Sequence, residues 1–125
     1  MEPGKDYLNY TDRISKDEFI RLFSAIEALS DWFTDEELDS YSFPRNSGSL
    51  GARYMIKKRI CDQLNFTELR KDIQILNEKG GKPVIAFRRS VGEIMERQKI
   101  GQVLCSVSHS RNYIATMTIF AFENV

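Results

Sequence analysis

The chain has 125 residues, a hydrophobic fraction of 42%, and 18 basic side chains balanced by 18 acidic ones. That length suits one domain, residues 1–125, whose core needs no disulfide bonds, and no apolar run is long enough to span a membrane. The zero net charge removes the attraction to phosphate backbones on which most nucleic-acid binding depends, so a small ligand or a protein partner is the better expectation.

Reactive side chains are few. The beginning of the chain contains no apolar segment of the kind that directs secretion, so we expect a cytoplasmic protein in which Cys61 and Cys105 are buried, reduced thiols. His109 is the only histidine, and any catalytic or metal site that needs an imidazole has to be built around it.

Two helices are expected in the first third of the chain. Ser15 and Glu18 have the spacing of a capping box, and apolar residues follow at helical intervals, which predicts an amphipathic helix that reaches to about Ser30. Thr34 and Glu37 have the same spacing, and they predict a short helix that ends ahead of the next proline.

A loop over residues 44–49 leads into the longest predicted helix. From residue 50 to about residue 64, apolar side chains recur at helical spacing over a wide face, namely Leu50, Tyr54, Ile56, Ile60, Cys61 and Leu64. A face of that width indicates a central helix that other elements surround.

Strands are expected to dominate the second half. Residues 72–76 and 83–87 flank a glycine-containing turn and predict a hairpin, while residues 90–93 have the spacing of another helix cap. Residues 102–107 and 113–122 read as two long strands. Together these elements predict an α+β fold in which a central helix packs on an antiparallel sheet.

Arg53 and Lys57 lie four residues apart on the central helix, so they share one face, which continues into the buried apolar stripe. Two cations in that position need an anion. One interpretation is that they pair with Glu36 or Glu37 of the preceding helix, because partly buried basic groups are usually paired. The other is that they bind a phosphate.

Two turns offer further groups for an anion site. Residues 80–83 form a glycine turn that leaves backbone amides accessible beside Lys82. Ser106, Ser108 and His109 end a strand, and hydroxyl and imidazole groups both donate hydrogen bonds to phosphate oxygens. We hypothesise that the middle helix, the glycine turn and the serine–histidine corner converge on a single anion-binding hollow.

Four short motifs follow one another along most of the chain: FTDEEL at 33–38, RYMIKK at 53–58, GKP at 81–83 and SVSHS at 106–110. In this order and spacing they resemble the holo-acyl-carrier-protein synthase group of the 4′-phosphopantetheinyl transferase family. The resemblance implies that family's small α+β fold. It also implies a substrate, coenzyme A, and a protein partner, an acyl carrier protein.

The reaction implied by the resemblance is attack of a carrier-protein serine on the β-phosphate of coenzyme A, with Mg²⁺ bridging the pyrophosphate. Members often act as homotrimers with the cofactor between subunits, and a homotrimer is implied here. The residues that the resemblance implies in contact with coenzyme A are Arg53, Lys57, Gly81, Lys82, Pro83, Ser108 and His109.

The chain departs from the family pattern around the expected metal. Lys58 stands where the family has a metal-binding glutamate, and Asp62 stands where it usually has a lysine, so the two charges are exchanged. We expect Lys57, Lys58 and Asp62 to form the catalytic group. No hydrophobic first strand is expected to present the second metal-binding carboxylate; Asp6 lies nearest to that role, and Asp12 is the alternative near the start.

These charges leave two functions open. The first is an active transferase that moves 4′-phosphopantetheine to a carrier serine. The second is a catalytically inactive homologue that binds coenzyme A or a carrier protein as a scaffold subunit, because a cation beside a pyrophosphate site weakens magnesium binding while it still attracts phosphate.

Overall fold

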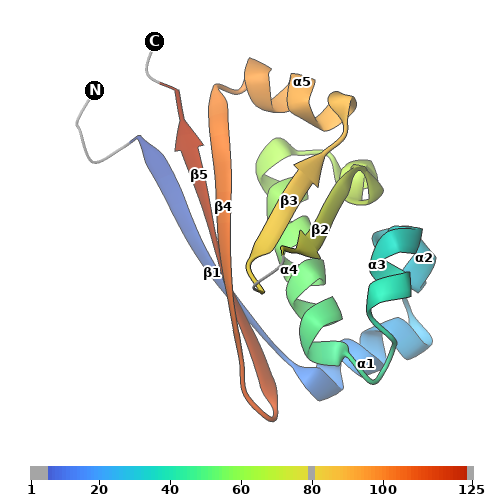
Figure 1. The fold of residues 1–125 in the computed structure, drawn as a ribbon. Helices are drawn as coiled ribbons and strands as arrows, with labels where there is room; N and C mark the ends of the chain where they lie inside the picture. Colours follow the sequence, from blue (N-terminus) through green and yellow to red (C-terminus); the bar gives the residue numbers. More distant parts are fainter. Residues whose placement is uncertain (1–5, 79–80, 124–125) are drawn as a thin grey trace.

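The computed structural model describes residues 6–78 and 81–123 (Figure 1). Its elements in chain order are β1 (Tyr7–Ser15), α1 (Lys16–Ala25), α2 (Leu29–Trp32), α3 (Asp35–Ser40), α4 (Ser47–Leu64), the 3-10 helix η2 (Thr67–Asp72), β2 (Ile73–Asn77), β3 (Pro83–Phe87), α5 (Arg89–Arg97), β4 (Ile100–His109) and β5 (Tyr113–Phe122). One antiparallel sheet has the strand order β1-β5-β4, and a second is the β2–β3 hairpin. The predicted α+β class is confirmed.

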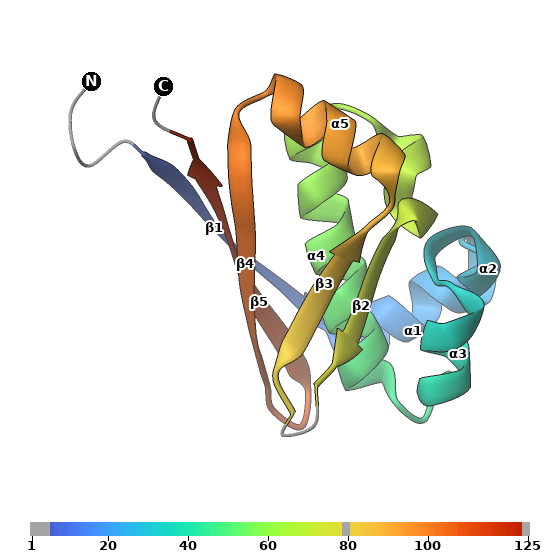
Figure 2. The ribbon, with the colours of Figure 1, turned by 45° about the horizontal axis from the view of Figure 1, so that its top comes forward.

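Helix α4 forms the centre of the core, as its wide apolar face predicted. One cluster of buried side chains, including Ile60 and Leu64, packs against the hairpin, α5 and the larger sheet. A second cluster, around Leu50 and Tyr54, packs against α1 and the α2–α3 segment. Figure 2 shows α4 passing between these groups of elements. The helix begins at Ser47, so half of the expected loop is helical.

The first strand corrects the sequence prediction. β1 pairs antiparallel with β5, from Tyr7 opposite Ala121 to Ser15 opposite Tyr113. Its side chains do not alternate cleanly between apolar and polar, but its backbone hydrogen bonds to β5 require no such pattern. The poor strand sequence at residues 1–5 lies outside the described part of the chain.

The first helix is shorter than predicted. The Ser15 hydroxyl accepts a hydrogen bond from the Glu18 amide at 3.0 Å, which confirms the cap, but α1 ends at Ala25. Residues Leu29–Trp32 form a separate turn of helix. This break places Trp32 in the core beside Phe23, with ring centroids 6.5 Å apart.

The other two predicted caps differ in outcome. Thr34 and Glu37 form a complete capping box at the start of α3. Ser90 is not a cap, because the N-cap of α5 is Arg88, and the Ser90 hydroxyl donates instead to Asp72.

The larger sheet is covered on one face. The helices and the β2–β3 hairpin all lie on the same side of it (Figure 1). On β5, the inward residues are buried, whereas the outward residues Ala115, Met117, Ile119 and Ala121 keep part of their surface exposed. The uncovered face therefore carries an apolar stripe, here called the β5 stripe, along its central strand.

Both cysteines are free. Cys61 is buried, as predicted, and burial raises the pKa of its thiol to about 11. Cys105 is only half-buried, and burial raises the pKa of its thiol as well. Among residues 6–78 and 81–123, no helix combines the length and the apolar character needed to cross a bilayer.

Candidate functional site

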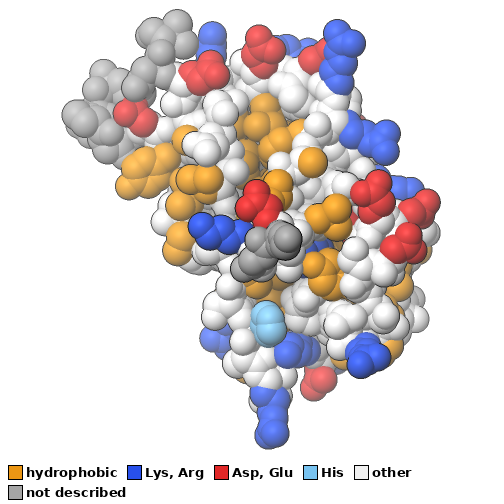
Figure 3. Space-filling view, viewed as in Figure 1, with side chains coloured by type: hydrophobic (Ala, Val, Ile, Leu, Met, Phe, Trp, Pro, Cys, Tyr) orange, Lys and Arg blue, Asp and Glu red, His pale blue; other side chains and the backbone are white. Residues whose placement is uncertain are grey.

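A small hollow of about 200 Å³ lies where the first half of α4 meets the hairpin turn and the end of β4. Its walls include Arg53 of α4, Gly81 and Pro83 of the turn, and His109 of β4. We call it the Arg53–His109 hollow. The structure thus brings together one representative of each group that the sequence analysis expected to converge. Figure 3 shows this face, with the one imidazole in pale blue and basic side chains in blue nearby.

Arg53 is buried, with 4% of its surface exposed, and is held by neutral groups. Its Nε donates to the carbonyl of Ile75 at 2.6 Å, and its Nη1 donates to the carbonyl of Ser49 at 3.0 Å. Its Nη2 donates to the Tyr41 hydroxyl and to the Asn77 Oδ1, at 2.9 and 3.0 Å. Within the described residues no carboxylate lies within ion-pair distance of this guanidinium, so its charge is not cancelled locally. Burial accordingly lowers the pKa of Arg53.

The imidazole of His109 lies against the first turn of α4. A methyl group added at Gly48 would approach the His109 Nδ1 to 3.4 Å. The side chain of the N-cap residue, Asn46, makes no capping hydrogen bond, and the first amides of a helix have no partner within it. The first of them, the Ser47 amide, donates to the carbonyl of Pro44 at 3.2 Å. The hollow therefore lies beside a buried guanidinium, an imidazole and a helix N-terminus without a side-chain cap, each of which favours an anion.

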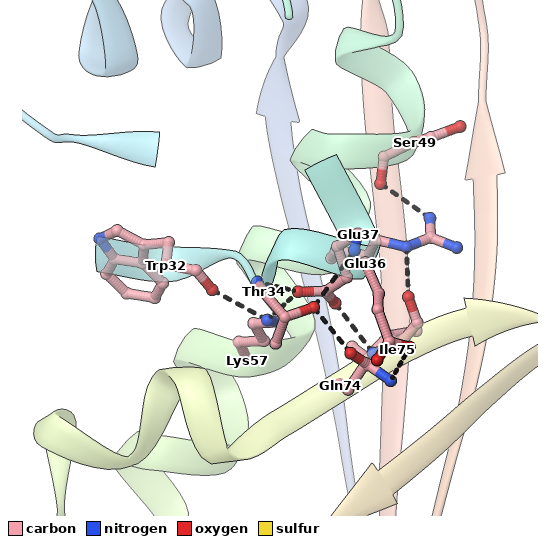
Figure 4. Close-up of polar contacts among 9 residues, drawn as sticks. Trp32, Thr34, Glu36, Glu37, Ser49, Lys57, Gln74 and Ile75 are labelled. Atoms are coloured by element: carbon pink, nitrogen blue, oxygen red, sulfur yellow. Dashed lines mark hydrogen bonds and ion pairs between the residues drawn. The ribbon is translucent and has the colours of Figure 1, made fainter. Parts of the chain in front are cut away.

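Lys57 does not reach this hollow, which corrects the expectation that it contacts coenzyme A. It is fully buried, and its ammonium lies 2.5 Å from the Glu37 Oε1 and donates to the carbonyl of Trp32 at 2.8 Å (Figure 4). Glu37 also accepts from the amides of Thr34 and Ile75, both at 2.9 Å. The interpretation that Lys57 pairs with an acid of the preceding helix is confirmed. Burial lowers the pKa of Lys57, and Glu37 opposes that change.

Two other predicted ligand contacts also lie elsewhere. Ser108 lines a separate hollow with Ser106 and Met117, because alternate residues of β4 face opposite sides of the sheet. Lys82 lines a neighbouring groove along β3 and β4, which shares Gly81 and Pro83 with the Arg53–His109 hollow but does not include Arg53 or His109. The Gly81 amide already donates to the Glu78 carbonyl at 2.9 Å, so the turn shapes the hollow without offering that amide to a ligand.

A second hollow, of about 370 Å³, lies between β1, α1 and α4, and we call it the β1–α4 hollow. Its charged lining residues are Asp12, Glu18 and Asp62, with Arg13, Lys58 and Arg59. Two of the predicted catalytic residues, Lys58 and Asp62, therefore share one site with each other, but not with Lys57.

The first-strand carboxylate that faces α4 is Asp12, not Asp6. Asp6 precedes β1, and its carbonyl accepts from the Phe122 amide at the far end of the sheet. The strand β1, which the sequence pattern did not predict, therefore places Asp12 rather than Asp6 opposite α4. Asp12 is bound by Arg59, whose Nε and Nη2 donate to the two carboxylate oxygens at 3.0 and 2.5 Å. This hydrogen bond raises the pKa of Arg59.

The residues of the β1–α4 hollow do not fit a divalent metal. Magnesium binds directly to carboxylate oxygens and waters. Here both oxygens of Asp12 already accept from a guanidinium, and Lys58 lines the same hollow. Among the residues that the structure describes, no cluster of three metal-ligating side chains is present.

Sequence reasoning missed several residues of both hollows. Arg59 gave no signal, because its partner is 47 positions away on an unpredicted strand. Tyr41 and Asn77, which hold Arg53, lie in or beside elements that were predicted correctly, but their approach to α4 depends on how those elements pack.

No protein-family model matches the chain. The chain is 30% identical over 93 residues to the holo-[acyl-carrier-protein] synthase of Fusobacterium nucleatum, with 70% of this chain and 75% of the relative covered. It is 27% identical over 114 residues to the corresponding synthase of Clostridium tetani, with 85% of this chain and 90% of the relative covered.

The fold agrees with that relationship. The crystal structure of Helicobacter pylori holo-[acyl-carrier-protein] synthase in complex with coenzyme A superposes with a TM-score of 0.72 at 16% identity, covering 91% of this chain and all of that one. With a curated relative at 30% identity over three quarters of its length, the chain belongs to the holo-acyl-carrier-protein synthase family of 4′-phosphopantetheinyl transferases.

Proposed function

We propose that this protein transfers the 4′-phosphopantetheine group of coenzyme A to a serine of an acyl carrier protein. In this reaction the serine oxygen forms a bond to the β-phosphorus, the bond from that phosphorus to the bridging oxygen breaks, and 3′,5′-adenosine bisphosphate leaves. The serine proton passes to a base or to solvent. The observation that carries the proposal is the Arg53–His109 hollow, set in the fold of this family.

Each wall of the hollow has a separate task in this proposal. The buried charge of Arg53 attracts a phosphate because its hydrogen-bond partners are neutral and, among the described residues, no carboxylate lies within ion-pair distance of it. His109 donates a hydrogen bond to a phosphate oxygen, and the amides that follow Ser47 in the first turn of α4 add donors beside it. Pro83 limits the size of the hollow.

Lys57 contributes by holding the backbone rather than by touching the ligand. Through Glu37 it connects α4 to α3 and to the amide of Ile75 on β2. The Ile75 carbonyl in turn accepts from Arg53. The buried pair therefore fixes the strand that positions the guanidinium.

A catalytically inactive, coenzyme A-binding homologue is the second candidate. The observation that favours it is the β1–α4 hollow, where Arg59 donates hydrogen bonds to both oxygens of Asp12 and Lys58 adds another positive charge. Such a protein keeps the ligand hollow without the carboxylates that a magnesium-dependent transfer uses. The family relationship favours the enzyme, and the local charges favour the scaffold.

One experiment separates the two candidates. The protein is incubated with coenzyme A and an apo-acyl carrier protein, and the carrier is weighed by mass spectrometry for the added phosphopantetheine group, beside an active synthase as a control. The enzyme is supported if transfer occurs, His109→Ala reduces it, and Thr67→Ala, at an exposed position of η2, leaves it unchanged. No transfer, together with calorimetric binding of coenzyme A, supports the scaffold. If coenzyme A does not bind in calorimetry and no carrier is modified, both the transferase and the coenzyme A-binding scaffold are refuted.

A homotrimer belongs to the same proposal. The β5 stripe on the uncovered sheet face is apolar, and Leu104 beside it is 47% exposed. Uncovered apolar faces of this kind are commonly buried against another chain.

A cytoplasmic location remains a prediction of the sequence.

A further inference from the structure

The Asp12–Arg59 pair is built as a rigid unit between β1 and α4. Both oxygens of Asp12 accept from Arg59, which is the two-pronged arrangement that a guanidinium makes with a carboxylate. The guanidinium also lies over the ring of Tyr10, 4.5 Å from its centroid. The Tyr10 hydroxyl donates to Gln63 at 3.0 Å, which ties the strand to the same helix a turn further on.

Isolated surface ion pairs are usually loose and weak, and this pair differs from them in two respects. Its side chains are only 28% and 24% exposed, and an aromatic ring restricts the guanidinium from one side. The charge of Arg59 is therefore held at one place, next to the one carboxylate that β1 presents to α4.

We propose that Arg59 takes, at Asp12, the place of a divalent cation, and that this protein binds its pyrophosphate ligand without metal. The exclusion of the cation follows from the described contacts alone, whereas the statement about the ligand rests on the proposed function. A cation at Asp12 has to displace two charge-assisted hydrogen bonds, and it meets the ammonium of Lys58 in the same hollow.

The charges that line the β1–α4 hollow also indicate that it does not bind a divalent cation. Three acidic and three basic side chains line it, so the hollow is neutral as it stands. A divalent cation would add two uncompensated positive charges, whereas a site designed for one has an excess of carboxylates. Arg59 supplies a positive charge that is part of the protein and does not depend on the concentration of a metal ion.

The test titrates the full chain with Mn²⁺ alone and measures the bound Mn²⁺ by electron paramagnetic resonance. The wild-type protein is expected to show no saturable Mn²⁺ binding at millimolar concentration. The double variant Lys58→Glu with Arg59→Gln frees Asp12 and adds a second carboxylate, and it is expected to bind Mn²⁺ at least about tenfold more tightly. The matched control, Arg111→Glu with Arg45→Gln, changes the net charge equally at two exposed sites and should gain nothing.

Several results would overturn the proposal. One is stoichiometric Mn²⁺ binding by the wild type that Asp12→Asn abolishes. Another is a folded double variant that gains no binding, because Arg59 and Lys58 would then not be what excludes the cation. Circular dichroism checks folding, and if the double variant does not fold, Arg59→Gln alone is titrated with the same expected direction.

A second measurement separates this inference from the proposed function. Calorimetric titration of coenzyme A into the wild type, in Mg²⁺ and in excess chelator, should give affinities that agree within about twofold. An affinity that collapses in chelator overturns the metal-independent binding. If coenzyme A does not bind in either buffer, the proposed function fails, while the Mn²⁺ comparison still decides whether Arg59 excludes a cation.

Discussion

The buried pair of Lys57 and Glu37 gives the sharpest stability prediction. Both side chains have no exposed surface, and they are joined at 2.5 Å. Replacing Lys57 with Met keeps a similar shape but leaves the Glu37 carboxylate without its cation in the interior. Removing one member of a buried pair costs about 3–5 kcal/mol, since the remaining charge loses its partner but not its burial.

The magnitude converts to a measurable shift in melting temperature. Unfolding entropies near 60 °C are about 2.1 cal/mol/K per residue, which for a chain of 125 residues makes 3–5 kcal/mol equal to a fall of about 11–19 °C. Lys57→Met with Glu37→Gln removes both charges, and Gln retains an acceptor for the Ile75 amide. The double variant should therefore be more stable than Lys57→Met alone.

The assay is thermal and urea unfolding followed by circular dichroism and by the fluorescence of Trp32, the only tryptophan. Lys58→Met is the matched control, because Lys58 is the next residue of the same helix and is exposed, so its replacement should change stability by no more than about 0.5 kcal/mol. The reasoning is refuted if Lys57→Met melts within a few degrees of the wild type, or if adding Glu37→Gln to Lys57→Met lowers the stability further.

Three further predictions follow from other parts of the fold. Replacing His109 with Ala should weaken coenzyme A binding by about tenfold in calorimetry, the loss expected for one hydrogen bond to a charged group, while Thr67→Ala leaves it unchanged; equal affinities would remove His109 from the site. The pKa of Cys61 is raised to about 11 in the folded protein from an ordinary 9.0, so its contribution to stability is complete below pH 9 and is lost as pH rises towards 11. Cys61→Ala should accordingly be less stable near neutral pH but lose less stability between pH 9 and 11, and parallel urea titrations that show the same alkaline loss in both proteins would contradict this. Ile119→Lys with Leu104→Lys places charges on and beside the β5 stripe and should convert a trimer to a monomer in light scattering, with Arg97→Lys on α5 as the neutral control; a wild-type monomer would rule out the trimer.

Local sequence determined the elements whose signals are short-range. The capping box at Thr34 and Glu37 and the wide apolar face of α4 correctly predicted two helices, because capping and amphipathic burial involve neighbours within a few residues. The β2–β3 hairpin followed from two apolar runs around a glycine turn. The family was also evident from the order of short motifs along the chain.

Tertiary packing decided what each charged residue does. β1 forms because its backbone pairs with the edge of β5. No local pattern in residues 7–15 predicts that pairing. Whether Lys57 contacts a ligand or Glu37 depended on where α3 packs, and the pairing of Asp12 with Arg59 depended on how β1 packs against α4. An ion pair depends on how close two charges lie in the folded chain, not on their separation in the sequence. The same spacing of charged residues is therefore compatible with a phosphate site or with an internal salt bridge, and the packing of the elements decides between them.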